Sequence, residues 1–168
     1  MTGRQIVSDT GPLITLEKLP DGYQFIRKLY STIIIPPTVL TELVQGQFEH
    51  AEAYLSHYGI IDIIEVVAAP GGNSLLELKA LDLGEREAIQ LSISRQLPLL
   101  IEEEAGRTAA RKLGLRISGI AGQILLATRQ GLIRAEEAEQ KLRILYKARR
   151  INRTIYDGLL IAVRQKPS

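Results

Sequence analysis

The sequence predicts a three-layer α/β/α domain, in which a mainly parallel central sheet lies between helices and a helical part follows at the C-terminus. Short apolar runs alternate with segments of helical periodicity as far as residue 118, and this alternation is typical of a parallel sheet whose strands are connected by helices. The runs are apolar at nearly every position, as in strands that are buried on both faces. Beyond Gly119 only helical periodicity remains, which indicates the helical C-terminal part.

Five apolar runs are the expected strands. They are rich in β-branched residues or leucine, and Pro, Gly or charged residues flank them and interrupt regular structure. In chain order they cover residues 5–8, 32–35, 60–67, 98–101 and 115–118. The run at 60–67 fits an edge strand or an extension of a crossover, and the run at 115–118 is the weakest of the five.

Helices are expected between and after these strands. Pro20, Asp21 and Gly22 separate the first two, Pro37 suits the first turn of the third, and Gly114 ends the last helix before the fifth strand. The expected helices cover residues 12–19, 23–30, 37–45, 48–58, 73–81, 83–96 and 105–113, and in the C-terminal part residues 121–130, 135–147 and 154–164.

The length and composition favour one soluble domain. A chain of 168 residues, 45% of them hydrophobic, can form one well-packed core. We therefore expect a single domain over residues 1–168, with a core at 4–133 and a helical extension at 134–168. The absence of Cys excludes disulfides and thiolate zinc sites. No apolar run reaches the roughly 18 to 20 residues of a membrane span, so a cytoplasmic protein is expected.

The tripeptide Asp9-Thr10-Gly11 has two interpretations. Asp-Thr-Gly is the local signature of aspartic proteases, which are all-β proteins, and an acid directly after a short strand is also where α/β sheets place metal-binding carboxylates. Here Pro12 and a helical stretch follow the tripeptide, inside an alternation of strands and helices. The context therefore favours the second interpretation.

Further acids follow other expected strands. Sites in open parallel sheets form outside the carboxyl ends of the strands. Asp9 lies at such an end, Glu103 lies just past the fourth strand, and Glu42 lies in the helix after the second strand, at the edge of its apolar stripe. These three carboxylates are expected in one crevice, where the Thr10 hydroxyl can cap the following helix.

The fourth acid comes from the stretch LDLGEREAIQL, which contains Glu85 and Glu87. Two residues apart on a helix means about 200° around its axis, so both side chains cannot face one site. Asp82 and Glu85 have the spacing of a capping box, which assigns a structural task to Glu85. Glu87 is therefore the preferred fourth acid.

Several carboxylates without His or Cys favour a hard cation such as Mg²⁺ or Mn²⁺, which prefers oxygen ligands. Converging acids repel one another unless a cation is present. A bound cation lowers the pKa of a water and stabilises charge on a phosphate. A receiver-type phosphoacceptor is the rival α/β site, but the paired acids after the first strand and the lysine near the last strand that it needs are not evident.

Five stretches in the chain match a known family pattern in order: VSDTGPLITLEKL, IIIPPTVLTEL, LDLGEREAIQLS, LLIEEEAGRTAARKLGL and ISGIAGQILLATRQGLI. They resemble the PIN-domain superfamily of metal-dependent ribonucleases, and in particular its small prokaryotic PIN-like proteins. The match spans about residues 5 to 133. The resemblance implies the α/β fold above and Mg²⁺- or Mn²⁺-dependent hydrolysis of RNA.

The resemblance also implies metal ligands by position: Asp9, Glu42, Glu87 and Glu103. Thr10 is implied as a supporting hydroxyl, and Glu85 and Glu102 are neighbours that can replace or assist the ligands. The chain departs from the family pattern at Glu102-Glu103, where Asp-Asp is expected. Each Glu is one methylene longer, which changes the geometry at the metal and bears on activity more than on the fold.

Two functions follow as hypotheses. The first is a metal-dependent endoribonuclease, of the toxin type that an antitoxin-like protein partner restrains. The alternative is a PIN-like module that has lost catalysis and binds nucleic acid or a protein partner. Metal-induced stabilisation of the fold separates the two, because only an intact site binds the cation.

Basic residues support an RNA substrate, although the net charge is only +2. Residues 141–153 hold six Lys or Arg and no acid. The candidates for phosphate contacts are Arg107, Arg111, Lys112, Arg149, Arg150 and Arg153. Tyr146 and Tyr156 are either base-stacking residues or tyrosines at the core edge. The amphipathic C-terminal segment equally fits a partner protein or a homodimer.

Overall fold

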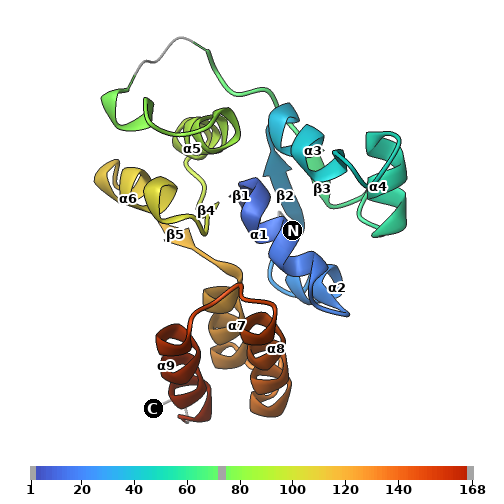
Figure 1. Ribbon diagram of the computed structural model, residues 1–168, viewed down its shortest axis with the longest axis vertical. Coiled ribbons are helices and arrows are strands. Elements are labelled where there is room, and N and C mark those ends of the chain that lie inside the picture. The colour runs from blue at the N-terminus through green and yellow to red at the C-terminus, as the bar shows by residue number, and fades with distance from the viewer. Residues whose placement is uncertain (1–2, 72–74, 166–168) are drawn as a thin grey trace.

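Five parallel strands form one sheet in the order β3-β2-β1-β4-β5 (Figure 1). The computed structural model describes residues 3–71 and 75–165. The strands are β1 (Gln5–Ser8), β2 (Thr32–Ile35), β3 (Ile64–Val66), β4 (Leu99–Leu100) and β5 (Ile117–Ser118). All four pairings between neighbouring strands are parallel, which confirms the predicted α/β fold class.

The third strand is shorter than the apolar run that predicts it. Residues 61–63 form a turn, in which the amides of Ile63 and Ile64 both donate to the carbonyl of Ile60 at 3.1 Å. Ile60 and Ile63 are apolar because they are buried in the core, and not because they belong to a strand. β3 is therefore a three-residue strand at the edge of the sheet, paired only with β2 among the described strands.

The helices follow the predicted alternation, with ends that differ by a few residues. They are α1 (Thr10–Glu17), α2 (Gly22–Ile26), α3 (Pro37–Val44), α4 (Ala51–His57), α5 (Leu83–Arg95), α6 (Glu104–Lys112), α7 (Ile120–Arg129), α8 (Ala135–Lys147) and α9 (Arg153–Arg164). The helix predicted at 73–81 is wrong where it is described: a single 3-10 turn, η1 (Leu76–Leu78), stands there, and residues 73 and 74 lie outside the described part. Among residues 75–81, only Leu78 and Leu81 are buried, so this described stretch has no apolar face long enough for a helix.

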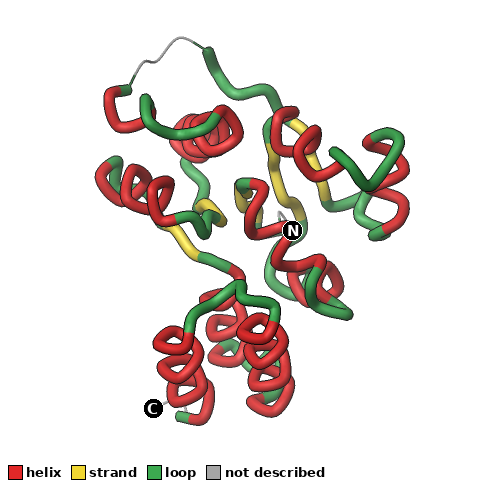
Figure 2. Tube along the Cα trace, in the orientation of Figure 1, coloured by secondary structure: helices red, strands yellow, loops and turns green. Residues whose placement is uncertain are grey.

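Alternate residues of the central strands enter two separate apolar clusters. Ile6, Ile33 and Ile35 pack with α1, α2, α3 and α7 on one face of the sheet, whereas Val7 and Ile34 pack with α5 and α6 on the other. Figure 2 shows the strands between these groups of helices. Both faces of the sheet are thus covered, as its nearly continuous apolar strands predict.

The C-terminal helices belong to the same apolar core. Leu142, Leu145 and Val163 join the cluster that contains Ile6, and α8 packs against both α7 and α9. The buried ammonium of Lys141 on α8 lies 2.6 Å from the carboxylate of Asp21. This contact ties α8 to the start of α2. The α8–α9 connection lies at the end of these helices that is nearer the sheet (Figure 1). In the ranges 3–71 and 75–165, no helix is long and apolar enough to span a membrane.

Candidate metal centre

An acidic pocket of about 380 Å³ lies outside the carboxyl ends of β1 and β4. The two strands are neighbours, so the residues that follow them meet at one edge of the sheet. The pocket is lined by Asp9, Thr10, Gly11, Glu42, Asp82, Glu102, Glu103, Arg149 and Arg150. Three of the four predicted ligands, Asp9, Glu42 and Glu103, are therefore brought together.

Asp9 is the most deeply placed of these three acids. Its amide donates to the carbonyl of Leu100 at 3.0 Å, which fixes the end of β1 beside β4, and only 6% of the residue is exposed. Burial raises the pKa of Asp9 to about 7, against a smaller lowering by the amide of Thr10. The negative charges of Asp82, Glu42 and Glu103 raise it further. A buried acid among acids is costly in its charged form, and a cation would relieve that cost.

Thr10 holds Glu42 and does not cap α1 as the sequence suggests. Its hydroxyl donates to the carboxylate of Glu42 on α3, and Asp9 occupies the N-cap position without a side-chain cap. Gly84 permits the close approach of α5 to the same carboxylate, because a Cβ at this position would lie 2.9 Å from Oε1 of Glu42. The orientation of Glu42 thus depends on two neighbouring helices.

Asp82 and Glu85 form the predicted capping box at the start of α5. The amide of Glu85 donates to Asp82 at 2.8 Å, and the amide of Asp82 donates to Glu85 at 3.2 Å. The capping task does not remove Glu85 from the site: the residue is 4% exposed, and its Oε1 atom has no hydrogen-bond partner in the described parts of the chain. Burial raises the pKa of Glu85 to about 7, and the charges of Asp82, Glu103 and Asp9 add to the shift.

Asp82, Glu85 and Glu103 each offer an oxygen atom, and these oxygens lie within 4.8 Å of one another. Oxygen donors in such a cluster fit Mg²⁺ or Mn²⁺. The buried oxygen of Glu85, which has no partner among the described residues, fits a bound cation, because buried polar atoms are nearly always bonded. The sequence interpretation assigned Asp82 to capping alone. The sequence did contain a signal for both acids: the capping-box spacing places Asp82 and Glu85 together at the start of one helix.

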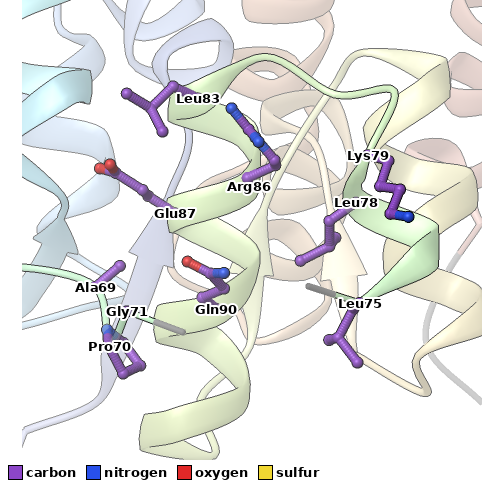
Figure 3. Close-up of a pocket in the computed structure, with 10 residues that line it drawn as sticks. All are labelled: Ala69, Pro70, Gly71, Leu75, Leu78, Lys79, Leu83, Arg86, Glu87 and Gln90. Carbon is purple, nitrogen blue, oxygen red and sulfur yellow. The ribbon is translucent and has the colours of Figure 1, made fainter. Parts of the chain in front are cut away.

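Glu87, the acid that the sequence favoured as the fourth ligand, is not a member of this cluster of Asp82, Glu85 and Glu103. Its carboxylate accepts a hydrogen bond from the hydroxyl of Thr38 at 2.9 Å. It lines a separate pocket of about 290 Å³, together with Leu83 and Arg86 (Figure 3). The two glutamates have different surroundings: Glu85 lies with Asp82 and Glu103, and Glu87 lines the other pocket.

Glu102 and Glu103 point to different partners although they are adjacent. Glu103 is exposed at the start of α6 within the acidic cluster. Glu102 accepts hydrogen bonds from the hydroxyl of Thr15 at 2.5 Å and from the amide of Ile120 at 2.9 Å. Glu102 therefore links α1 to the start of α7, at the wall of the pocket.

Two of the six predicted phosphate-binding residues, Arg149 and Arg150, line the acidic pocket. Arg107 donates to the carbonyl of Ile101 at 2.9 Å, and Arg111 pairs with Glu104 at 3.8 Å. Lys112 is exposed at the end of α6. The basic residues of α6 are therefore outside the described pocket lining.

The remaining basic and aromatic candidates, Arg153, Tyr146 and Tyr156, contact other residues of α8 and α9. Arg153 pairs with Asp157 at 3.3 Å on α9. The rings of Tyr146 and Tyr156 stack with 4.8 Å between centroids and 6° between planes. Each ring covers one face of the other, so this pair joins α8 to α9 at the core edge.

Comparisons with known proteins agree with this architecture. The family model DUF3368, described as a PIN domain, matches residues 5–165. The chain is similar to the solved structure of a PilT N-terminus domain protein, SSO1118, from the hyperthermophilic archaeon Sulfolobus solfataricus P2, with a TM-score of 0.50, 12% identity, and coverage of 98% of this chain and 96% of that one. At this identity the likeness concerns the fold alone. No curated protein matches the chain. The match over nearly the whole chain shows that this protein belongs to the PIN-domain family DUF3368.

Proposed function

We propose that the acidic pocket binds Mg²⁺ or Mn²⁺ and that the protein hydrolyses phosphodiester bonds in RNA. The observation that carries the proposal is the buried oxygen of Glu85, which has no described hydrogen-bond partner and lies beside Asp82 and Glu103. Family membership supports the choice of chemistry, since PIN domains are typically nucleases.

The proposed ligands are the acids that converge: Asp9, Glu42, Asp82, Glu85 and Glu103. Glu85 takes the place that the sequence interpretation gave to Glu87. Thr10 supports the site by holding the carboxylate of Glu42, and Glu102 supports it through the pocket wall. The longer Glu103 reaches the cluster in place of the expected Asp, since its oxygen lies within 4.8 Å of those of Asp82 and Glu85.

A divalent cation bound here would supply an activated water and neutralise charge on the phosphate. The side chains of the protein supply orientation and counter-charge. The capping box fixes Asp82 and Glu85 relative to α5, and the hydrogen bond of Asp9 to β4 fixes the opposite wall. Arg149 and Arg150 add positive charge to a pocket that would otherwise repel an anionic substrate.

The test combines Mn²⁺ titration, followed by thermal unfolding, with cleavage of single-stranded and structured RNA. Millimolar Mn²⁺ should raise the melting temperature of the wild type, because the cation binds only the folded state. Glu85→Gln should reduce this shift and the cleavage rate, whereas the matched control Glu87→Gln should preserve both. A wild type that binds no metal and cleaves no RNA would contradict the proposal and favour a PIN-like binding module.

The proposal includes RNA as substrate and an antitoxin-like protein as a restraining partner. Ile155 and Ile161 on α9 are 45% and 61% exposed and supply apolar surface for such a partner or for a second copy of the chain. Co-expression with a neighbouring small reading frame would test the restraint. A partner that forms a stable complex and suppresses cleavage is the expected outcome, and cleavage that persists in the complex would contradict it.

A further inference from the structure

The turn between α8 and α9 brings two arginines over the acidic pocket. Arg149 and Arg150 both line the pocket beside Asp9, and Arg150 contacts Gly11 across a separation of 139 positions. The two side chains have different surroundings although they are adjacent. That difference separates a structural role from a role in binding the substrate.

Arg150 is already engaged by the protein. Its Nη2 donates to the carbonyl of Gly11 at 3.1 Å, and its Nε donates to the hydroxyl of Thr15 at 2.9 Å. Its guanidinium also lies 3.6 Å from the carboxylate of Glu102, with 28% of the Arg150 side chain exposed. These contacts anchor the turn on α1 and leave little of this cation for a ligand.

Arg149 is exposed at the pocket, and its side chain has no hydrogen bond or ion pair with residues in the ranges 3–71 and 75–165. No described acid pairs with its guanidinium, so the positive charge is available to a ligand. A guanidinium offers several donors in a planar fork that matches two oxygens of a phosphate.

The backbone conformation of the turn gives no reason for an arginine at position 149. The amide of Arg149 donates to Tyr146 at 3.0 Å, and that of Arg150 donates to Leu145 at 2.9 Å, which is a Schellman motif. Arg149 stands at the left-handed position, with φ of 60°. Glycine is the usual residue there, because a Cβ makes this conformation costly. The other described left-handed residues are Gly46, Gly59, Gly114, Gly131 and Gln96.

We infer that Arg149 is a catalytic residue that contacts a non-bridging oxygen of the scissile phosphate, with Arg150 as the residue that positions it. The inference rests on the proposed function and assigns a role to the C-terminal helices. During hydrolysis the water oxygen forms a bond to phosphorus and gives up a proton, while the bond from phosphorus to one ribose oxygen breaks; that oxygen leaves with the electron pair and takes up a proton, which yields a phosphate monoester and a free hydroxyl. Arg149 stays protonated, transfers no proton, and stabilises the negative charge that grows on the phosphate.

The first test is Arg149→Gly, which removes the side chain and suits the backbone. The variant should melt at the same or a higher temperature and keep the Mn²⁺-induced shift. Its kcat should fall about 10²-fold, as for loss of one preorganised donor to a charged transition state. Arg149→Lys should be intermediate, since it keeps the charge and loses the fork.

Two matched controls test whether the fall in kcat comes instead from relief of backbone strain or from the loss of one positive charge. Gln96→Gly makes the same backbone change at the far end of α5, where φ is 54°. Arg134→Ala removes an arginine outside the predicted RNA-binding set, which already pairs with Glu136. Both controls should cleave RNA within about twofold of the wild type. An Arg149→Gly variant that also does so would overturn the inference and leave the proposed function intact.

The positioning role of Arg150 requires a comparison in two backgrounds. Arg150→Ala should lower both kcat and the melting temperature in the wild type. In the Arg149→Gly background it should still lower the melting temperature but should not reduce kcat further, because the residue that it positions is gone. Additive losses of kcat would overturn the positioning role.

Binding of a short single-stranded RNA in Ca²⁺ provides a readout that does not need cleavage. Arg149→Gly should weaken this binding about tenfold, the size of one charge-assisted hydrogen bond, while Arg134→Ala should change it little. Equal affinities of wild type and Arg149→Gly would overturn the inference. A wild type that shows Arg149-dependent binding but neither a Mn²⁺ shift nor cleavage would refute the proposed function while the phosphate contact stands.

Discussion

Arg150 donates a hydrogen bond from Nε to the hydroxyl of Thr15 at 2.9 Å, and so joins the α8–α9 turn to α1 across 135 positions of sequence. Thr15 is 1% exposed, and its hydroxyl also donates to Glu102 at 2.5 Å. Removal of the Arg150 guanidinium would leave the half-buried carboxylate of Glu102 without its ion-pair partner. The contact therefore stabilises the wall of the acidic pocket as well as the C-terminal helices.

Arg150→Ala should reduce the free energy of unfolding by about 1.5 to 3 kcal/mol, the range for hydrogen bonds to charged groups. Urea unfolding in EDTA measures this loss without a contribution from metal. Arg143→Ala removes an exposed arginine from α8 and should change stability by no more than about 0.5 kcal/mol. Equal effects of the two variants would show that the contacts of Arg150 add nothing to stability.

Asp9→Asn should abolish cleavage without unfolding the protein. Asn preserves the shape of the side chain at the N-cap of α1, and it loses the charge that the proposed metal requires. In EDTA the variant should be as stable as the wild type or more stable, because one of several mutually repelling acids is gone. The Mn²⁺-induced rise in melting temperature should shrink. Cleavage at the wild-type rate would place the active site elsewhere.

The metal-free protein should lose stability as pH rises towards neutrality. Folding raises the pKa of Asp9 from 3.8 to about 7, mainly because the residue is buried. The unfolded chain thus releases the proton near pH 4 while the folded protein keeps it, so this contribution is complete below pH 4 and is lost as pH rises to 7.

Urea unfolding in EDTA at pH 5 and pH 8 measures this effect, with Asp9→Asn as the reference that lacks the titrating group. The stability of the wild type relative to the variant should fall between these pH values by on the order of 2 kcal/mol, at about 1.4 kcal/mol per pKa unit. A constant difference would mean that Asp9 ionises normally in the folded protein.

Gly84→Ala should weaken metal binding more than it weakens the fold. The added methyl group would lie 2.9 Å from the carboxylate of Glu42, whose flexible end can move aside. The displaced carboxylate would lose its hydrogen bond from Thr10, and the Mn²⁺ concentration for half-maximal stabilisation should rise. Gly158→Ala is the control, because a Cβ there meets no atom within 4 Å. An unchanged metal response in Gly84→Ala would mean that Glu42 does not bind the cation.

The strand and helix pattern was predictable because it follows from local physical chemistry. Runs such as Ile33–Ile35 are apolar on both faces, and the sheet buries them on both faces. Asp9 and Glu103 follow β1 and β4, and parallel pairing brings such positions to one edge of a sheet. The third strand was predicted too long, because buried residues in turns such as Ile60 resemble strand residues in sequence. The helix predicted at 73–81 was wrong in its described part, where a 3-10 turn stands.

The sequence by itself determined the fold class, the placement of Asp9 and Glu103 at the ends of two strands, and the separation of Glu85 from Glu87 on α5. Tertiary structure decided which glutamate joins Asp82 and Glu103, because that depends on the rotation of α5, whose Ala88 and Ile89 pack in the core against the sheet. It also decided that Arg149 and Arg150 lie beside Asp9. Their approach depends on α8 docking through Lys141 and Asp21, a contact between residues 120 positions apart that no local pattern encodes.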